Sequence, residues 1–225
     1  RVEGQQQAAE DEFVDEEATS ATKTDTPLIE IPQSISVVTE EQIKQQQAQT
    51  MSEALRYTPG FFAAYESDVR FDNAPIVRGF TPTLYLDGLL LPDSRGFGAP
   101  RIEPYGLERI EVLKGPSSGL YGQVPPGGLI DMVSKRPKPY AIHEVVLQYG
   151  SYDRYQGAFD LGGRVDDGGR ILYRLTGLLR KSDTQTKFAE DNRIFIAPSV
   201  TVRPFENTSI TISAYFQKDD NKGIS

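Results

Sequence analysis

The C-terminal part of the chain consists of long segments in which apolar and polar residues alternate. In residues 193–203, for example, Ile194, Ile196, Val200 and Val202 alternate with residues such as Arg193, Ser199 and Thr201. Because successive side chains of a β-strand point to opposite faces, each segment predicts a strand with one apolar and one polar face. Five such strands are predicted, at residues 143–151, 154–165, 171–180, 193–203 and 208–218.

The length of these segments favours a membrane β-barrel wall over a soluble sheet, although the alternation alone fits both. Strands of soluble sandwiches average about 5 or 6 residues, whereas a barrel strand needs roughly ten to cross an outer membrane. The connections at 166–170 and 204–207 are short, as periplasmic turns are, and the polar connection at 181–191 is longer, as external loops are. The connection at 149–153, by contrast, is short for an external loop. Since the smallest such barrels have about eight strands, five strands cannot close a barrel, and we expect the chain to be a fragment of a longer protein.

Composition excludes several functional classes. The mean hydropathy is −0.43 and no apolar run approaches the roughly 18 residues of a membrane-spanning helix. The net charge of −8 argues against nucleic-acid binding, because phosphate contacts require clustered Lys and Arg. The chain has no Cys, so neither a disulfide framework nor a thiolate site is expected.

No catalytic or metal-binding constellation is evident, so we expect neither an enzyme nor a resident cofactor. His143 is the only histidine, which leaves no pair for a Ser–His nucleophile or a two-His metal site. Residues 115–119 (GPSSG) are faintly similar to a phosphate loop, but no Gly-Lys-Ser/Thr follows and Pro116 lacks an amide donor. This stretch is better interpreted as a tight turn.

The region before the alternating segments predicts a compact sheet joined by tight turns, with short helices. Short β-type runs at 34–39, 84–86, 89–91, 109–113 and 129–134 lie between clusters of Gly, Pro and Ser. Thr39 precedes Gln42 with capping-box spacing, which predicts a helix to about Gln47. Ser52 is expected to cap a second short helix over residues 53–57.

Residues 31–137 resemble the plug domain of TonB-dependent outer-membrane transporters. The matching motifs are IPQSISVVT at 31–39, ALRYTPG at 54–60, RGF at 78–80, YLDG at 85–88, LERIEV at 107–112, KGP at 114–116, LYG at 120–122, PGG at 126–128 and VSKRP at 133–137. The resemblance implies an α+β plug, built as a small mixed sheet with short helices, followed by antiparallel transmembrane β-barrel strands. It further implies a flexible acidic segment at 1–26, a plug at 27–138, and at 139–225 the first five strands of a barrel of about 22.

Family resemblance also implies a function and a location. Such a protein lies in the outer membrane of a Gram-negative-type bacterium, surrounded by lipid, with the plug inside the barrel and the N-terminus in the periplasm. It imports a scarce nutrient by binding and gating, driven by a TonB-type inner-membrane energy-coupling protein. Residues 22–27 and 31–38 most resemble the ferrichrome-type branch, which favours a ferric hydroxamate siderophore as cargo. The alternatives are cobalamin, a sugar or another metal chelate in the same architecture and, more remotely, a soluble β-rich binding protein.

Two groups of plug residues are candidates for binding. By resemblance, the loops at 61–75 and after Leu91 form the plug apices, where aromatic rings and Arg suit the apolar rim and acceptor oxygens of a ferric chelate. The candidates for cargo contact are Tyr65, Arg70, Arg95 and Phe97. Arg78 and Lys114 match basic positions that pair with glutamates on the inner barrel wall of the family and hold the plug in place. Alternatively, both cations cap carbonyl groups at strand ends.

The N-terminal segment carries the candidate site for the energy-coupling protein. Residues 1–26 are rich in Gln, Glu, Asp, Thr and Ala, and composition alone indicates an acidic flexible leader. In the family, a short segment near this position, the TonB box, adds as a β-strand to the coupling protein. The best candidate is the stretch Glu12, Phe13, Val14, Asp15 and Glu16.

Overall fold

The computed structural model describes two compact units, within residues 1–134 and 135–225. The described residues are 33–63, 75–92, 101–116, 121–122, 124–185, 187–205 and 207–222, together with the backbone of two short paired strands, β1 (Glu17–Ala18) and β2 (Thr26–Pro27). Among these residues, no helix combines the length and apolar character needed to cross a membrane.

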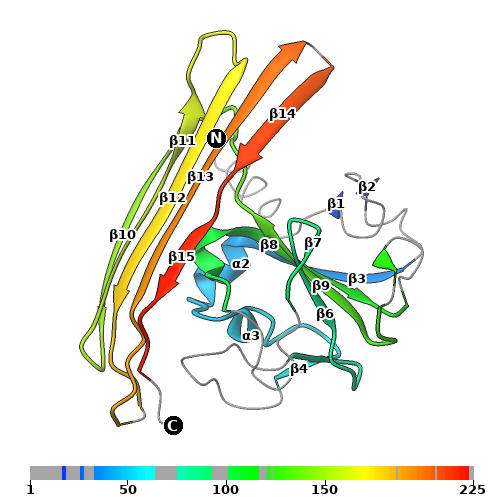
Figure 1. The fold of residues 1–225 in the computed structure, drawn as a ribbon, viewed down its shortest axis with the longest axis vertical. Coiled ribbons are helices and arrows are strands. Elements are labelled where there is room, and N and C mark those ends of the chain that lie inside the picture. The colour runs from blue at the N-terminus through cyan, green and yellow to red at the C-terminus, as the bar shows by residue number, and fades with distance from the viewer. Residues whose placement is uncertain are drawn as a thin grey trace, which may run out of the picture. The chain divides into compact units, whose positions relative to one another are not determined.

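The first unit contains the mixed sheet that the sequence predicts. Its strand order is β3-β8-β9-β6-β7 (Figure 1). The pairing of β6 with β9 is parallel and the other pairings are antiparallel. The strands are β3 (Ser34–Thr39), β6 (Thr83–Leu86), β7 (Leu89–Leu90), β8 (Leu107–Lys114) and β9 (Gly128–Ser134). A separate antiparallel pair joins β4 (Phe61–Ala63) and β5 (Pro75–Val77).

Short helices accompany this sheet. Helix α2 (Glu40–Gln45) begins as predicted, because Thr39 Oγ1 accepts a hydrogen bond from the Gln42 amide at 3.3 Å. Helix α3 (Met51–Ala54) is capped by Thr50, whose Oγ1 accepts from the Glu53 amide at 3.1 Å. The prediction that Ser52 caps this helix is therefore wrong: Thr50 has the extended backbone of an N-cap, and Ser52 is buried inside the helix. A 3₁₀ turn, η2 (Pro104–Gly106), precedes β8.

The core of the plug sheet depends on a close backbone approach at the start of β9. Tyr85, Leu113 and Leu129 are buried together and pack against apolar side chains of β3. Gly128 has φ +114°, and a Cβ atom there would lie 1.9 Å from the Leu113 carbonyl oxygen. Only glycine therefore allows β9 to begin against β8 at this point.

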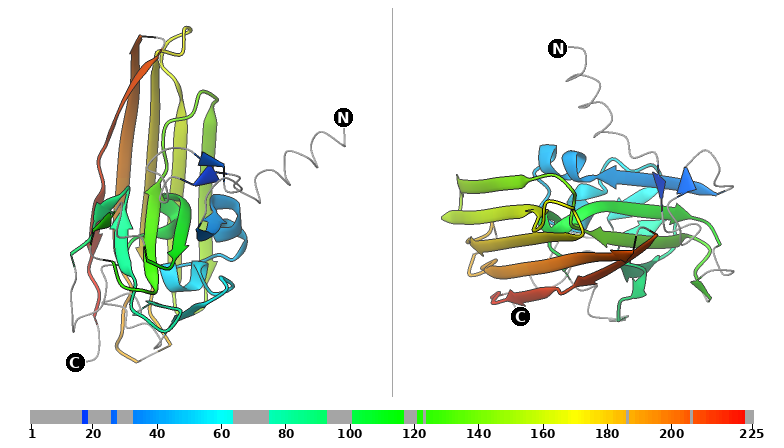
Figure 2. Two further views of the ribbon diagram at one scale, coloured as in Figure 1. Left: turned by 90° about the vertical axis from the view of Figure 1, so that its right-hand side faces the viewer. Right: turned by 90° about the horizontal axis from the view of Figure 1, so that it is seen from above.

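The second unit is one antiparallel sheet in which β10–β14 follow chain order and β15 also pairs with β13. Figures 1 and 2 show these strands side by side as a continuous sheet. They are β10 (Ile142–Gly150), β11 (Arg154–Arg164), β12 (Ile171–Lys181), β13 (Arg193–Phe205), β14 (Thr208–Ser213) and β15 (Phe216–Asp219). The first four predicted segments are confirmed to within two residues at each end.

The fifth predicted segment, 208–218, is not one strand but two. Strand β14 pairs with the C-terminal half of β13, and β15 pairs with residues Arg193–Ile196 at its start. Between them, the Ala214 amide donates to the Pro198 carbonyl at 2.9 Å. Because Pro198 has no amide hydrogen, it cannot return this hydrogen bond, and the ladder is interrupted there.

Candidate functional site

The sheet of the second unit has the reverse of the burial pattern of a soluble protein. On the apolar face of β13, Ile194 and Val200 are 48% and 41% exposed. On its polar face, Arg193 and Ser199 are only 1% and 5% exposed. Apolar residues of the other strands are also exposed, among them Val145, Leu147, Leu179, Ile210 and Ile212, whereas Leu172 and Leu178 of β12 are buried. The sheet therefore presents a broad apolar surface, while several of its charged residues, Asp160, Arg174, Arg180 and Arg193, are buried.

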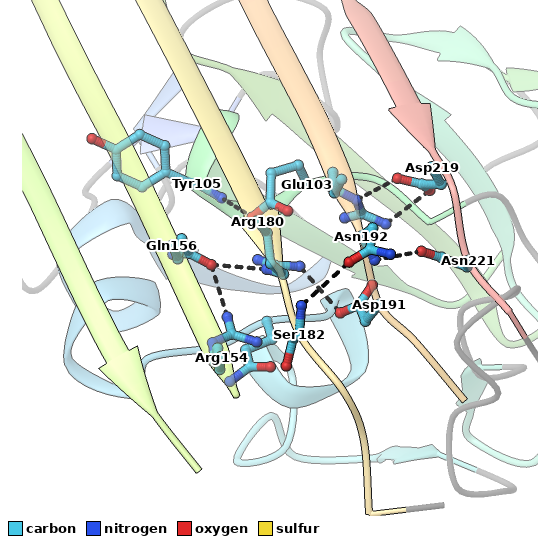
Figure 3. Close-up of polar contacts among 12 residues, drawn as sticks. Glu103, Tyr105, Arg154, Gln156, Arg180, Ser182, Asp191, Asn192, Asp219 and Asn221 are labelled. Atoms are coloured by element: carbon cyan, nitrogen blue, oxygen red, sulfur yellow. Dashed lines mark hydrogen bonds and ion pairs between the residues drawn. The ribbon is translucent and has the colours of Figure 1, made fainter. Parts of the chain in front are cut away.

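The polar face carries two groups of side-chain hydrogen bonds that together involve four strands (Figure 3). The Gln156 side-chain oxygen accepts from Arg154 at 2.7 Å and from Arg180 at 2.8 Å. Arg193 binds both carboxylate oxygens of Asp219, at 2.6 and 3.0 Å. Guanidinium and carboxylate groups pair strongly in this two-bond geometry. Side chains therefore link β13 to β15 through Arg193, and β11 to β12 through Gln156 and Arg180, in addition to the backbone pairing.

A second charged cluster on the polar face surrounds Asp160 of β11. Arg174 of β12 donates to both oxygens of the Asp160 carboxylate, at 3.0 and 2.7 Å. Lys135 Nζ lies 2.9 Å from Asp160 Oδ2, and Thr176 Oγ1 donates to Oδ1 at 3.3 Å. All four residues are buried, so one buried carboxylate is shared by two buried cations.

In the first unit, the two basic residues singled out from the sequence lie close together. Arg78 and Gly79 both have positive φ values, +50° and +85°, and occupy a tight turn closed by hydrogen bonds between Val77 and Phe80. The Arg78 amide donates to the Gly60 carbonyl at 2.9 Å. Its guanidinium Nη1 lies 3.9 Å from the position that a Cβ atom would take on Gly115, the residue after Lys114.

The electrostatics of this cationic pair favour an anionic partner. Burial, followed by the nearby charge of Arg78, lowers the pKa of Lys114. Lys114 Nζ donates to the Ser36 hydroxyl at 2.6 Å, a neutral acceptor on β3. The Arg78 side chain is exposed, and within the described part of the chain its guanidinium has no hydrogen bond or ion pair. Two adjacent like charges form a site that a carboxylate would stabilise.

The other candidate residues lie outside the described residues. This applies to the predicted cargo contacts Tyr65, Arg70, Arg95 and Phe97, and to the predicted coupling segment at 12–16. In the described ranges, no cluster of three or more His, Asp or Glu side chains is arranged to hold a metal ion. The Asp160 cluster was not predicted from the sequence. The Asp160–Arg174 pair could have been found, because both residues lie on the polar faces of neighbouring predicted strands.

Comparison with known proteins gives consistent matches. Residues 27–129 match the family model of the TonB-dependent receptor plug domain. The chain is 41% identical over 212 residues to the ferrichrome outer membrane transporter/phage receptor of Escherichia coli, covering 92% of this chain and 28% of that protein. It is also 41% identical to the ferrioxamine receptor of Yersinia enterocolitica, covering 90% and 29%.

The fold likewise matches solved receptor structures. The pyoverdine outer membrane receptor of Pseudomonas aeruginosa superposes with a TM-score of 0.85 at 25% identity, covering 94% of this chain and 31% of that one. The siderophore receptor PiuA of Acinetobacter baumannii gives a TM-score of 0.79 at 27% identity, covering 94% and 30%. These matches confirm the expected fold class. It is a mixed-sheet plug followed by antiparallel strands of a barrel wall, and these residues do not close the barrel. The chain spans less than a third of the length of each of these relatives.

Proposed function

We propose that this chain, which belongs to the family of TonB-dependent receptors, forms the plug and first wall strands of an outer-membrane receptor that imports a ferric siderophore. Family members are outer-membrane receptors, and the relatives with 41% identity are named as receptors for ferrichrome and ferrioxamine. Both named ligands are hydroxamate siderophores, so we infer a ferric hydroxamate as the cargo. The proposed domain limits are 1–26 for the leader, 27–138 for the plug and 139–225 for the wall.

The observation that carries this proposal is the reversed burial of the second unit's sheet. Strands of 9, 11, 11 and 13 residues expose one apolar face, with side chains such as Val145, Leu179 and Val200, and bury charged residues such as Asp160 and Arg193 on the other. In water, such a surface would drive association; in an outer membrane, it contacts lipid tails while the polar face turns toward the lumen. We infer that outer-membrane lipid is the partner of the apolar face, with the plug inside the barrel and the N-terminus in the periplasm.

The cationic pair supports a role in holding the plug. We infer that Arg78 and Lys114 bind glutamates on the inner barrel wall, because the pair concentrates positive charge beside a neutral hydroxyl rather than beside a carboxylate. Arg78 offers a planar group for a two-bond contact, whereas Lys114 offers a single point charge. Loss of these ion pairs would free this end of β8 and the neighbouring turn.

In the proposed mechanism, cargo binding is coupled to a change in the plug. Tyr65, Arg70, Arg95 and Phe97 are proposed to contact the chelate, and residues 12–16 are proposed to add as a strand to the TonB-type coupling protein. Cargo can release the N-terminal segment only if it binds the two plug states with different affinities. The coupling protein would then displace the plug and open a path.

A ligand panel tests the assignment of cargo. We expect ferric hydroxamates to quench the intrinsic tyrosine fluorescence of the complete receptor in detergent in a saturable manner, because this chain places tyrosines in the plug. Cobalamin, a sugar and the iron-free hydroxamate are the controls, and they should produce weaker quenching or none. A receptor that responds to cobalamin or sugar but to no ferric chelate would contradict the siderophore assignment.

A further inference from the structure

The segment that follows the plug sheet is fixed to the wall by buried charges that the proposed function does not use. Strand β9 ends at Ser134, and the next residue, Lys135, forms the ion pair with Asp160 described above. Both side chains are almost fully buried, at 2% and 1% exposed. An ion pair this deeply buried contributes little net stability, but it holds its two partners in one geometry as long as both are present.

Two further contacts hold the same segment by its backbone. Arg174, which binds Asp160, also donates to the Arg136 carbonyl at 3.2 Å. Arg164, at the end of β11, donates to the Pro139 carbonyl at 2.5 Å. Residues 135–139 (KRPKP) are thus attached at three points to neighbouring wall strands. Because this segment has no large apolar side chain to pack, charge and hydrogen bonding are its means of attachment.

The residue on the plug side of the junction is held as well. The Asp87 carboxylate accepts from the Ser134 amide at 2.9 Å and from the Ser134 hydroxyl at 2.7 Å. Asp87 occupies the tight turn between β6 and β7 with φ +52°, and its amide donates to the Met132 carbonyl at 2.9 Å. The peptide that joins the two units is therefore restrained on each side, by Asp87 in the first unit and by Asp160 in the second.

We propose that Lys135 and Asp160 form an anchor that fixes the C-terminal end of the plug and limits how far the plug moves when it is pulled from its N-terminal side. This inference rests on the proposed transport function. Without the anchor, tension would pass through residues 135–139 to the first wall strand. Fully extended, these five residues span at most roughly 17 Å, so once the two backbone contacts also yield, β9 could move farther before any wall strand is disturbed. Lys135 and Asp160 are thus positioning residues that need not touch the cargo.

A spin label reports directly on the anchor. These 225 residues contain no cysteine, so Ala141→Cys, at an exposed position just after the anchored segment, provides a single label site within them. In the complete receptor, Lys135→Met should shift the spectrum from the immobile toward the mobile component, because it removes the ion pair that attaches the start of the segment to Asp160, while the Arg174–Asp160 pair remains. Lys135→Arg should restore the immobile component. Lys138→Met, in the same segment but only half buried, is the matched control; a Lys135→Met spectrum equal to this control would overturn the proposal.

Entry of a large antibiotic tests the limit on plug movement. Cells that express the Lys135→Met receptor should become sensitive to a glycopeptide too large for porins, but only when the coupling protein is active, with siderophore affinity unchanged. Equal sensitivity without the coupling protein, or no added sensitivity with it, would contradict the anchor. The spin-label experiment requires neither cargo nor coupling protein, so failure of the siderophore assignment and failure of the anchor are distinguishable.

Discussion

Replacing Asp160 with Asn should lower the unfolding free energy of the complete receptor by about 3–5 kcal/mol, the cost typical of breaking a buried ion pair on one side. The substitution keeps the shape of the side chain but removes the one carboxylate that Lys135 and Arg174 share. Two buried cations then lose the carboxylate that they share and part of their hydrogen bonding. Urea titration in detergent, monitored by far-UV circular dichroism, measures this difference in unfolding free energy.

An exposed ion pair supplies the control for this experiment. Glu190 accepts from Lys222 at 2.7 Å, and the Lys222 side chain is 69% exposed. Because water solvates the exposed Lys222 ammonium that remains after the change, Glu190→Gln should leave the urea midpoint almost unaltered. Equal midpoint shifts for the Asp160 and Glu190 variants would show that the buried cluster has no special role in holding the wall.

A lysine introduced at Val200 should cost about 2–4 kcal/mol when the receptor is folded in a bilayer. Val200 lies in the middle of β13 on the exposed apolar face, which in the proposed function contacts the hydrocarbon core of the membrane. On a soluble protein, the same exposed substitution would change stability by roughly 0.5 kcal/mol or less. The expected stability cost of Val200→Lys therefore differs clearly between a membrane-spanning wall and a soluble sheet.

The matched control is the same substitution near a strand end. Val165 follows β11 directly and is exposed at the turn to β12, so Val165→Lys should cost only about 0–1 kcal/mol in a bilayer. Unfolding in lipid vesicles measures both variants. A Val200→Lys receptor as stable as the Val165→Lys receptor would exclude a lipid-facing wall at this strand.

Local patterns in the sequence were sufficient to predict most of the elements. The alternation over 193–203 reports which side chains share a face, and the Thr39 hydroxyl with Gln42 three residues later reports a helix start. The break between β14 and β15 was missed because it arises from Pro198 on the neighbouring strand. Alternation within one segment contains no information about a missing donor in its partner.

The candidate sites depend on contacts that link distant parts of the chain. Asp160 could be placed on a polar face from the sequence, but its pairing with Thr176 requires the register of β11 with β12. Lys135 comes from a segment without periodicity, so nothing local indicated that it reaches Asp160. Resemblance to the family selected Arg78 and Lys114, but their proximity follows from the turn at Val77–Phe80 and the backbone at Gly115.

Uptake of radioactive iron is a direct test of the proposed transport function. Cells that lack their own siderophore receptors, and express the complete receptor, are given a ferric hydroxamate with and without a functional coupling protein. We expect saturable accumulation of iron that requires both the receptor and the coupling protein. Iron uptake that is the same with and without the receptor, for every ferric siderophore supplied, would contradict it.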